Sequence, residues 1–128
     1  MVIDDERTAR TELALLLARW GRVEEAESAQ QGLTKIREAM AASDPYSLVC
    51  VDLCMPGEGG LEALNAIRDL DERSGTDRTE VVMVTSSDDK HDVIEAFRQQ
   101  ADAYLVKPVS AAKIEELVAR LGGGEGQR

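Results

Sequence analysis

Four short apolar runs in the chain each end at a polar residue with reactive chemistry. Met1–Ile3 leads to Asp4 and Asp5, Ser47–Val51 to Asp52, Val81–Val84 to Thr85, and Ala103–Val106 to Lys107. Continuous apolar runs of this length are typical of parallel strands that are buried on both faces. Val23–Ala29 predicts a weaker second strand, polar enough to lie at an edge of the sheet.

Apolar residues between these runs recur at the spacing of helices. The first stripe is formed by Ala9, Leu13, Leu16, Leu17 and Trp20, with Gly21 as a natural stop. The later stripes are Leu33–Met40, Leu61–Ile67 with an end near Asp71, Val93–Phe97, and Ile114–Leu121 after a candidate N-cap at Ser110. Strands that alternate with helices predict an α/β fold with helices on both faces of a parallel sheet. We expect a flavodoxin-like, doubly wound sheet of five strands in the order 2-1-3-4-5, with five helices.

This topology would collect the polar residues at one edge of the sheet. Ligands of open α/β sheets bind beyond the carboxyl ends of the strands, and the first and third strands are neighbours in this order. Asp4, Asp5 and Asp52 would then converge. Clustered carboxylates repel one another, and Mg²⁺, which prefers oxygen ligands, would relieve that repulsion. The alternative is that Asp4 and Asp5 only favour the dipole of the first helix.

Three residues at this edge have the chemistry for phosphoryl transfer. Asp52 is the candidate nucleophile, because a carboxylate can attack phosphorus and form an acyl phosphate. Lys107 offers a positive charge on a long side chain, and Thr85 offers a hydroxyl. Each residue also has a structural interpretation. Loop aspartates often form turns, a single lysine is usually solvated, and a threonine at a strand end carries little information by itself.

Composition narrows the function classes. The chain has 128 residues, 43% hydrophobic and 31% charged, which fits one globular domain. A net charge of -10 and 3% aromatic residues argue against direct binding of nucleic acid by this domain. No apolar stretch is long enough to span a membrane, no secretory signal is recognisable, and Cys50 fits a buried strand, so we expect a cytoplasmic protein. Residues 122–128 predict a flexible Gly-rich tail or linker.

Taken together, these motifs resemble the receiver domain of two-component response regulators, and most of all single-domain receivers of the chemotaxis type. The matching segments are Val2–Glu6, Val51–Pro56 with Gly60–Glu62, Val84–Ser86, and Ala103–Pro108. The similarity extends from Val2 to Leu121, and we expect the receiver domain to span residues 1–121.

The resemblance implies a metal site and a phosphoacceptor. Asp52 would accept the phosphoryl group and contribute to the binding of Mg²⁺. Asp5 would be a direct ligand of the ion, Asp4 a ligand through water, and the backbone carbonyl of Cys54 a further ligand.

Other residues would bind and report the phosphoryl group. By resemblance, Thr85 and Lys107 contact its oxygens, the Lys107–Pro108 bond is cis, and Tyr104 is a rotameric switch coupled to Thr85. The switch would alter the surface of the fourth helix, fifth strand and fifth helix.

The implied function is a phosphorylation-dependent signalling switch. A histidine kinase or phosphotransfer protein would donate the phosphoryl group, and an unidentified protein would be the downstream target. The domain would catalyse only its own phosphorylation and dephosphorylation, without an external substrate. It would be a monomer or a phosphorylation-dependent dimer, and would contact neither nucleic acid nor membrane.

The residues at these positions also bear on three alternative functions. A flavin-binding electron carrier needs a phosphate loop after the first strand, where this chain has Asp4-Asp5-Glu6. A dehalogenase-type phosphatase needs Asp-x-Asp there. A degenerate receiver that acts as a scaffold is the main alternative, although the acidic, hydroxyl and lysine positions are intact.

The chain also departs from the family pattern. Only three residues precede Asp4, which indicates either a shortened start or a frayed first strand. Gln100 stands where glycine is usual, which puts the turn before the fifth strand in question. Cys54 and Ser87 occupy positions that tune the lifetime of the phosphoryl group in the family.

Overall fold

The computed structural model describes residues 1–53, 55, 59–75, 78–86, 90–98 and 100–121. Within these ranges the strands are β1 (Val2–Ile3), β2 (Glu25–Ala26), β3 (Leu48–Asp52), β4 (Glu80–Thr85) and β5 (Ala103–Val106). The helices are α1 (Arg7–Leu17), α2 (Ala29–Ala41), α3 (Gly60–Ser74), α4 (Lys90–Arg98) and α5 (Ala111–Arg120), and a 3-10 turn (Ala18–Trp20) continues α1.

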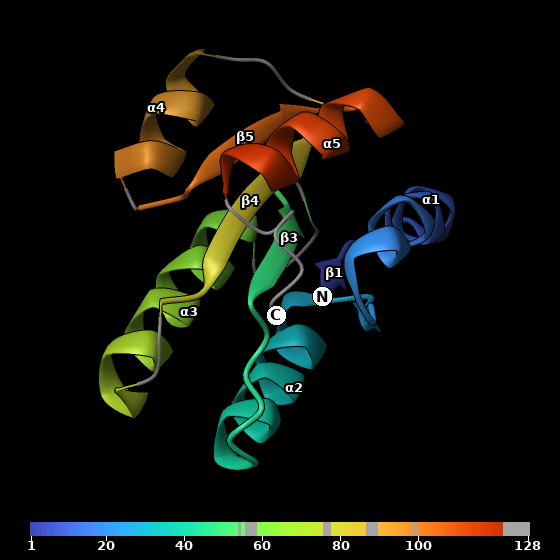
Figure 1. Ribbon diagram of the computed structural model, residues 1–128. Coiled ribbons are helices and arrows are strands. Elements are labelled where there is room, and N and C mark those ends of the chain that lie inside the picture. The colour runs from blue at the N-terminus through green and yellow to red at the C-terminus, as the bar shows by residue number, and fades with distance from the viewer. Residues whose placement is uncertain (54, 56–58, 76–77, 87–89, 99, 122–128) are drawn as a thin grey trace.

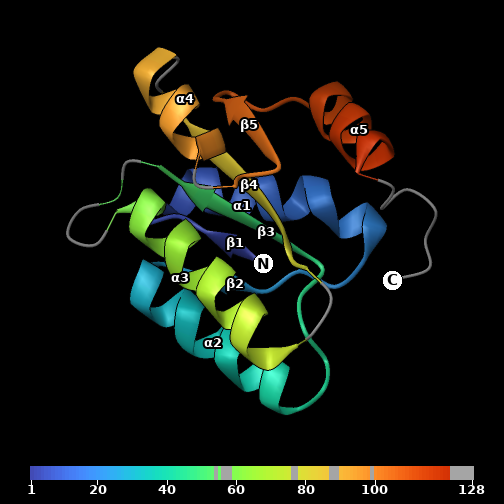
Figure 2. The ribbon, with the colours of Figure 1, turned by 90° about the vertical axis from the view of Figure 1, so that its left-hand side faces the viewer.

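The strands form one parallel sheet in the order β2-β1-β3-β4-β5, as predicted (Figure 1; Figure 2 also labels β2). Asp52 pairs with Val84, and Thr85 pairs with Val106. The ends of β4 and β5 are therefore in register, and β3 ends one residue earlier along the sheet edge. This register brings Asp52, Thr85 and Lys107 to the same end of three adjacent strands.

Side chains of alternate strand residues pack into two separate hydrophobic cores, one on each face of the sheet. In β4, Val81 and Met83 belong to the core under α2 and α3, whereas Val82 and Val84 belong to the core under α1 and α5. Figure 2 shows α2 and α3 side by side on one face, with α1 behind the strands. Cys50 is fully buried in the second core, where burial raises the pKa of its thiol to about 11. It acts as a small apolar residue, as predicted.

Polar side chains fix the starts of the helices. Glu6 caps α1, accepting hydrogen bonds from the amides of Ala9 and Thr8 at 2.9 and 3.4 Å. Ser28 caps α2 through the amide of Gln31 at 3.1 Å, and the predicted cap Ser110 accepts from the amide of Lys113 at 3.2 Å. These caps satisfy amides that have no partner within the helix.

Two element boundaries differ from the prediction. The second strand is limited to Glu25–Ala26, because Ser28 already caps α2 and Ala29 belongs to that helix. The third helix continues past Asp71 to Ser74 and ends at Gly75, whose φ of 69° is the left-handed conformation typical of a helix end.

Gln100 adopts the left-handed conformation that glycine would favour, with φ of 72°. Its amide bonds to the carbonyl of Phe97 at 3.0 Å, which closes the end of α4. The turn before β5 therefore keeps the geometry of a glycine turn despite the bulkier residue.

None of the helices in the described part of the chain is long and apolar enough to cross a membrane.

Candidate functional site

Asp52 is the last residue of β3, and its residue surface is only 7% exposed. The start of α3 packs directly against its backbone. A Cβ atom at Gly60 would lie 2.7 Å from the Cα of Leu53 and would also collide with the carbonyl oxygen of Asp52. The glycine in this position is what allows α3 to begin so close to the end of β3.

Asp4 is buried and held at several of its polar atoms. Its amide donates to the carbonyl of Ala26 at 3.0 Å, which extends the pairing of β1 with β2 by one bond. Its carboxylate accepts from the amide of Glu6 at 2.9 Å through Oδ1 and from Lys107 Nζ at 2.8 Å through Oδ2. Asp5, the next residue, is exposed.

Lys107 bridges the acidic residues and β4. Its Nζ lies 2.8 Å from Asp4 Oδ2 and 3.6 Å from Asp52 Oδ2, and its backbone amide donates to the carbonyl of Thr85 at 2.7 Å. Burial alone would lower the pKa of Lys107, but the hydrogen bond to Asp4 and the charges of Asp52 and Asp4 outweigh it, so the pKa is raised. The ammonium therefore stays charged at neutral pH. The Lys107–Pro108 bond is cis.

Asp4, Asp5, Asp52 and Lys107 form what we call the acid cluster. Each of the three carboxylates offers an oxygen, and these oxygens all lie within 4.8 Å of one another. The carboxylates outnumber the ammonium by three to one among these four residues. Such an excess of negative charge in a partly buried place suits a hard divalent cation with oxygen ligands, and the donor set fits Mg²⁺.

The remaining predicted site residues lie nearby or outside the described residues. Thr85 is fully buried at the end of β4. Tyr104 is half-buried in β5 and packs against the core under α2 and α3. Cys54 and Ser87 lie outside the described residues, as does the predicted tail at residues 122–128.

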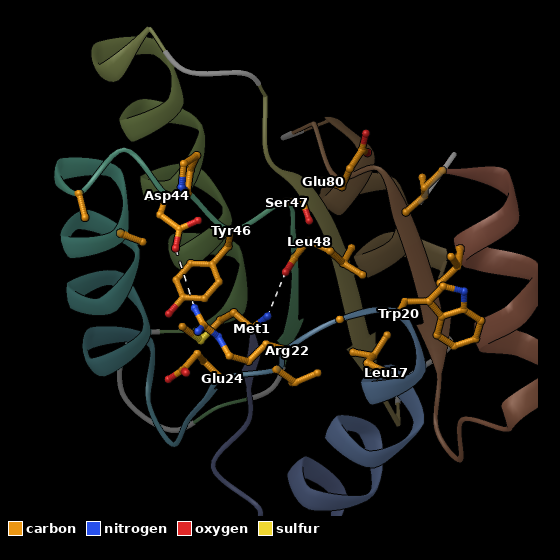
Figure 3. A pocket seen from close by; sticks show the side chains of 17 residues that line it. Met1, Leu17, Trp20, Arg22, Glu24, Asp44, Tyr46, Ser47, Leu48 and Glu80 are labelled. Atoms are coloured by element: carbon orange, nitrogen blue, oxygen red, sulfur yellow. Dashed lines mark hydrogen bonds and ion pairs between the residues drawn. The ribbon is translucent and has the colours of Figure 1, made fainter. Parts of the chain in front are cut away.

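A separate cavity of about 430 Å³ opens at the opposite, amino-terminal edge of the sheet (Figure 3). Trp20, Tyr46 and Leu48 line it, and the amino group of Met1 donates to the carbonyl of Leu48 at 3.1 Å. Burial lowers the pKa of that amino group. Since Leu48 begins β3 and Asp52 ends it, the cavity and the acid cluster lie at opposite ends of the strand.

Comparison with known families agrees with the sheet-edge geometry. The family model for the response regulator receiver domain matches residues 1–119. The chain belongs to this family. Receiver domains are regulatory parts of response regulators rather than classical enzymes.

Relatives of this receiver domain are longer proteins. It is 38% identical over 124 residues to an uncharacterized response regulatory protein of Vibrio cholerae, covering 94% of this chain and 47% of that protein. It is 33% identical to the transcriptional regulatory protein AfsQ1 of Streptomyces coelicolor, covering 90% of this chain and 47% of that protein. The chain therefore spans about half the length of these relatives.

Solved structures share its fold. The CheX-CheY-BeF3-Mg complex from Borrelia burgdorferi contains a chain that matches with a TM-score of 0.81 at 20% identity, covering 94% of this receiver domain and 86% of that chain. At this identity the likeness establishes the fold alone.

Three contributions to the receiver domain were missed at the sequence level. Glu6 caps α1, and an acidic residue just before a helical stripe could have indicated this. Arg10 contacts the backbone of Asp4, for which the sequence holds no local signal. The third contribution is a second charged group, the ion-pair cluster of Arg68, Asp71, Arg78 and Asp102, which joins α3 to the residues just before β4 and β5.

Proposed function

We propose that this receiver domain accepts a phosphoryl group on Asp52 from a histidine kinase or a phosphotransfer protein, in a reaction that depends on Mg²⁺. One observation carries the proposal. Asp52 ends a buried strand, and one of its carboxylate oxygens lies within 4.8 Å of a carboxylate oxygen of Asp4 and of Asp5. Its Oδ2 lies 3.6 Å from Lys107 Nζ. An acidic nucleophile next to a candidate cation site and a fixed positive charge fits acyl phosphate chemistry.

The transfer balances without a further reactant. A carboxylate oxygen of Asp52 forms a bond to phosphorus as the bond to the phosphohistidine nitrogen breaks, and the leaving imidazole takes up a proton. Hydrolysis by water returns the carboxylate and releases inorganic phosphate. Asp4, Asp5, Asp52 and the Cys54 backbone carbonyl would hold Mg²⁺, which offsets the negative charge of the phosphoryl oxygens when bound.

Lys107 and Thr85 serve the transferred group. Lys107 is already charged and directed at the acid cluster, so it can exchange a carboxylate partner for a phosphoryl oxygen without a change of protonation. The Thr85 hydroxyl, on the neighbouring strand, donates a hydrogen bond to another phosphoryl oxygen. Thr85 is paired with Val106, and Lys107 follows Val106, so both groups lie at the carboxyl ends of neighbouring strands.

Phosphorylation then alters the surface formed by α4, β5 and α5. Thr85 moves toward the phosphoryl group, and the ring of Tyr104 takes a more buried position behind it. Ile94 and Phe97 on α4 are 56% and 47% exposed, and they provide apolar contact area for a downstream protein.

The scope of the function follows the same proposal. The receiver domain spans residues 1–121, works in the cytoplasm, and changes only its own phosphorylation state. It binds protein partners rather than nucleic acid or membrane, and it is a monomer or a dimer that forms on phosphorylation.

Intact-mass spectrometry tests the proposal. After incubation with acetyl phosphate and Mg²⁺, the wild type is expected to gain the mass of one phosphoryl group, which hydroxylamine removes as it does from acyl phosphates. Asp52→Asn should gain none, because an amide is not a nucleophile for this reaction. EDTA should suppress the gain in the wild type.

Asp69→Asn is the matched control, since Asp69 is an acid on α3 with a side chain that is 60% exposed. It should be labelled like the wild type. Undiminished labelling of Asp52→Asn would place the nucleophile elsewhere. A wild type that binds Mg²⁺ but accepts no phosphoryl group would instead favour the scaffold function.

A further inference from the structure

The segment that carries Asp4 and Asp5 follows the short strand β1, which pairs with β2 and β3. β1 contains two residues, and its pairing with β2 ends with the bond from the Asp4 amide to the carbonyl of Ala26. The next polar group along the backbone is the carbonyl of Asp4, where the chain turns from β1 toward α1. This carbonyl belongs to the planar peptide that joins Asp4 to Asp5. Its position therefore sets the direction in which the side chains of Asp4 and Asp5 project.

Arg10 binds that carbonyl. Its side chain is only 12% exposed, and its Nη1 donates to the Asp4 carbonyl oxygen at 2.9 Å. Its Nε donates to Glu25 Oε1 at 3.0 Å. Arg10 lies on α1 and Glu25 on β2. One planar guanidinium therefore connects α1 and β2 to the backbone of Asp4, which lies between β1 and α1.

The backbone of Glu25 is held by its neighbours in the sheet and in α2. It pairs with Val2 in the sheet, and its backbone carbonyl accepts a hydrogen bond from Lys35 Nζ of α2 at 2.8 Å. The Glu25 side chain is 40% exposed, so the ion pair with Arg10 adds little to stability. Its larger consequence is geometric, because it orients the guanidinium toward the Asp4 carbonyl.

We propose that Arg10 is a positioning residue for the cation site, holding the Asp4 carbonyl so that the carboxylates of Asp4 and Asp5 stay within reach of Asp52. This inference rests on the proposed function, because it concerns the binding of Mg²⁺ by the acid cluster. Arg10 touches neither the ion nor the reacting atoms, and acts through the Asp4 backbone.

The sign of the effect separates positioning from simple charge. Removing a positive charge near three carboxylates would, through Coulomb attraction alone, tighten the binding of a cation. Loss of positioning would weaken it. Removal of a residue that orients a metal ligand typically costs about 10–100-fold in metal affinity, so the loss should exceed the Coulomb gain.

The test is the dissociation constant of Mg²⁺, measured by isothermal titration calorimetry on the wild type, Arg10→Met, Arg10→Lys and Arg7→Met. We expect Arg10→Met to bind Mg²⁺ about tenfold or more weakly, and Arg10→Lys to lie between it and the wild type. Arg7 is an exposed residue one turn earlier on α1, and Arg7→Met removes the same charge. It should bind Mg²⁺ at least as tightly as the wild type.

Phosphorylation by acetyl phosphate gives a second, independent measurement. In Arg10→Met the Mg²⁺ concentration for half-maximal labelling rate should rise by the same factor as the dissociation constant, while the rate at saturating Mg²⁺ stays near that of the wild type. A lower saturating rate with an unchanged half-maximal concentration would overturn the inference.

The failures can be told apart. A wild type that binds no Mg²⁺ contradicts the proposed function, and this inference with it. A wild type that binds Mg²⁺, together with an Arg10→Met variant that binds it equally or more tightly, overturns the role of Arg10 alone. A lower melting temperature in EDTA with an unchanged dissociation constant would do the same, since it marks Arg10 as a structural brace.

If Arg10→Met does not fold, Glu25→Gln and Arg10→Lys replace it. Glu25→Gln removes the ion pair but leaves the guanidinium and its bond to Asp4 in place. Both variants should bind Mg²⁺ more weakly than the wild type, and wild-type affinity in both would overturn the inference.

Discussion

Within the described part of this receiver domain, the acid cluster and the ion-pair cluster have opposite charge arrangements. In the acid cluster three carboxylates face one ammonium. In the ion-pair cluster two guanidinium groups face two carboxylates, with Arg68 Nη2 2.7 Å from Asp102 Oδ2 and Arg78 Nη1 2.6 Å from Asp102 Oδ1. Balanced charges compensate one another, so that removing one partner leaves the other uncompensated, whereas an excess of one sign calls for a ligand of the other.

The side chains of the ion-pair cluster also make further hydrogen bonds. Arg68 also donates to Asp71 Oδ2 at 3.1 Å and to the carbonyls of Thr79 and Gln100, and Asp102 also accepts from the amide of Val81 at 2.7 Å. The side chains of Arg68, Asp71 and Asp102 are each at most 11% exposed. A cluster in which donors and acceptors match so closely is structural, and we expect its loss to affect stability rather than ligand binding.

The largest effect is expected from Asp102→Ala. It leaves the guanidinium of Arg68 buried beside an empty position, which typically costs about 3–5 kcal/mol in the free energy of unfolding. Urea denaturation measures this cost. Asp69→Ala removes an exposed ion pair with Arg73 and should cost less than about 1 kcal/mol. Equal costs for the two variants would show that the ion-pair cluster is not a buried structural unit.

Asp52→Asn should have the opposite sign in the absence of divalent cations. Removing one of three neighbouring carboxylates relieves repulsion, so the variant should be more stable than the wild type in EDTA by about 1 kcal/mol. Urea denaturation in EDTA measures the difference. A loss of stability like that of Asp102→Ala would contradict the contrast between the clusters.

A smaller gain is expected from Gln100→Gly, beside the ion-pair cluster. Gln100 has φ of 72°, and its carbonyl accepts from Arg68 Nε at 3.0 Å and Arg78 Nη2 at 2.9 Å. Glycine adopts this conformation without steric cost, so we expect a gain of about 0.5–1 kcal/mol in thermal or urea unfolding. A loss of stability would indicate that the Gln100 side chain itself supports the turn.

The smallest effect concerns Glu80, at the start of β4. Burial, followed by the charge of Asp102, raises the pKa of Glu80 above its ordinary value of 4.5. The stability linked to its proton is thus fully present below pH 4.5 and is lost as the pH rises through the folded-state pKa. Glu80→Gln should therefore be more stable than the wild type at pH 7, by less than about 1 kcal/mol, and this difference should shrink toward pH 4. A difference that grows on acidification would contradict the direction of the shift.

The sequence was sufficient for the fold and for the acid cluster because both depend on local pattern. Apolar runs located the strands, and strand ends located Asp4, Asp52, Thr85 and Lys107. The second strand was predicted too long because Ser28 and Ala29 read equally well as strand residues, and only the helix cap decides between the two.

The ion-pair cluster could not be predicted, because its pairs depend on distant contacts. Arg68 and Asp102 are 34 residues apart, and Arg68 lies in a helix with many other charged positions. Periodicity assigns such residues to a solvated face and carries no information on which charges meet. Arg10 could not be predicted for the same reason, since its partners are Asp4, which follows β1, and Glu25, which lies in β2.

Melting temperatures of the wild type and Asp5→Asn, measured over a series of Mg²⁺ concentrations, test the nature of the acid cluster most directly. Asp5 is exposed, so its replacement should leave the fold intact. We predict that the wild type melts at progressively higher temperature as Mg²⁺ is added, by mass action, and that Asp5→Asn shows little or no rise. A wild type that does not respond to Mg²⁺, or an equal rise in both proteins, would contradict the assignment of these carboxylates to a cation site.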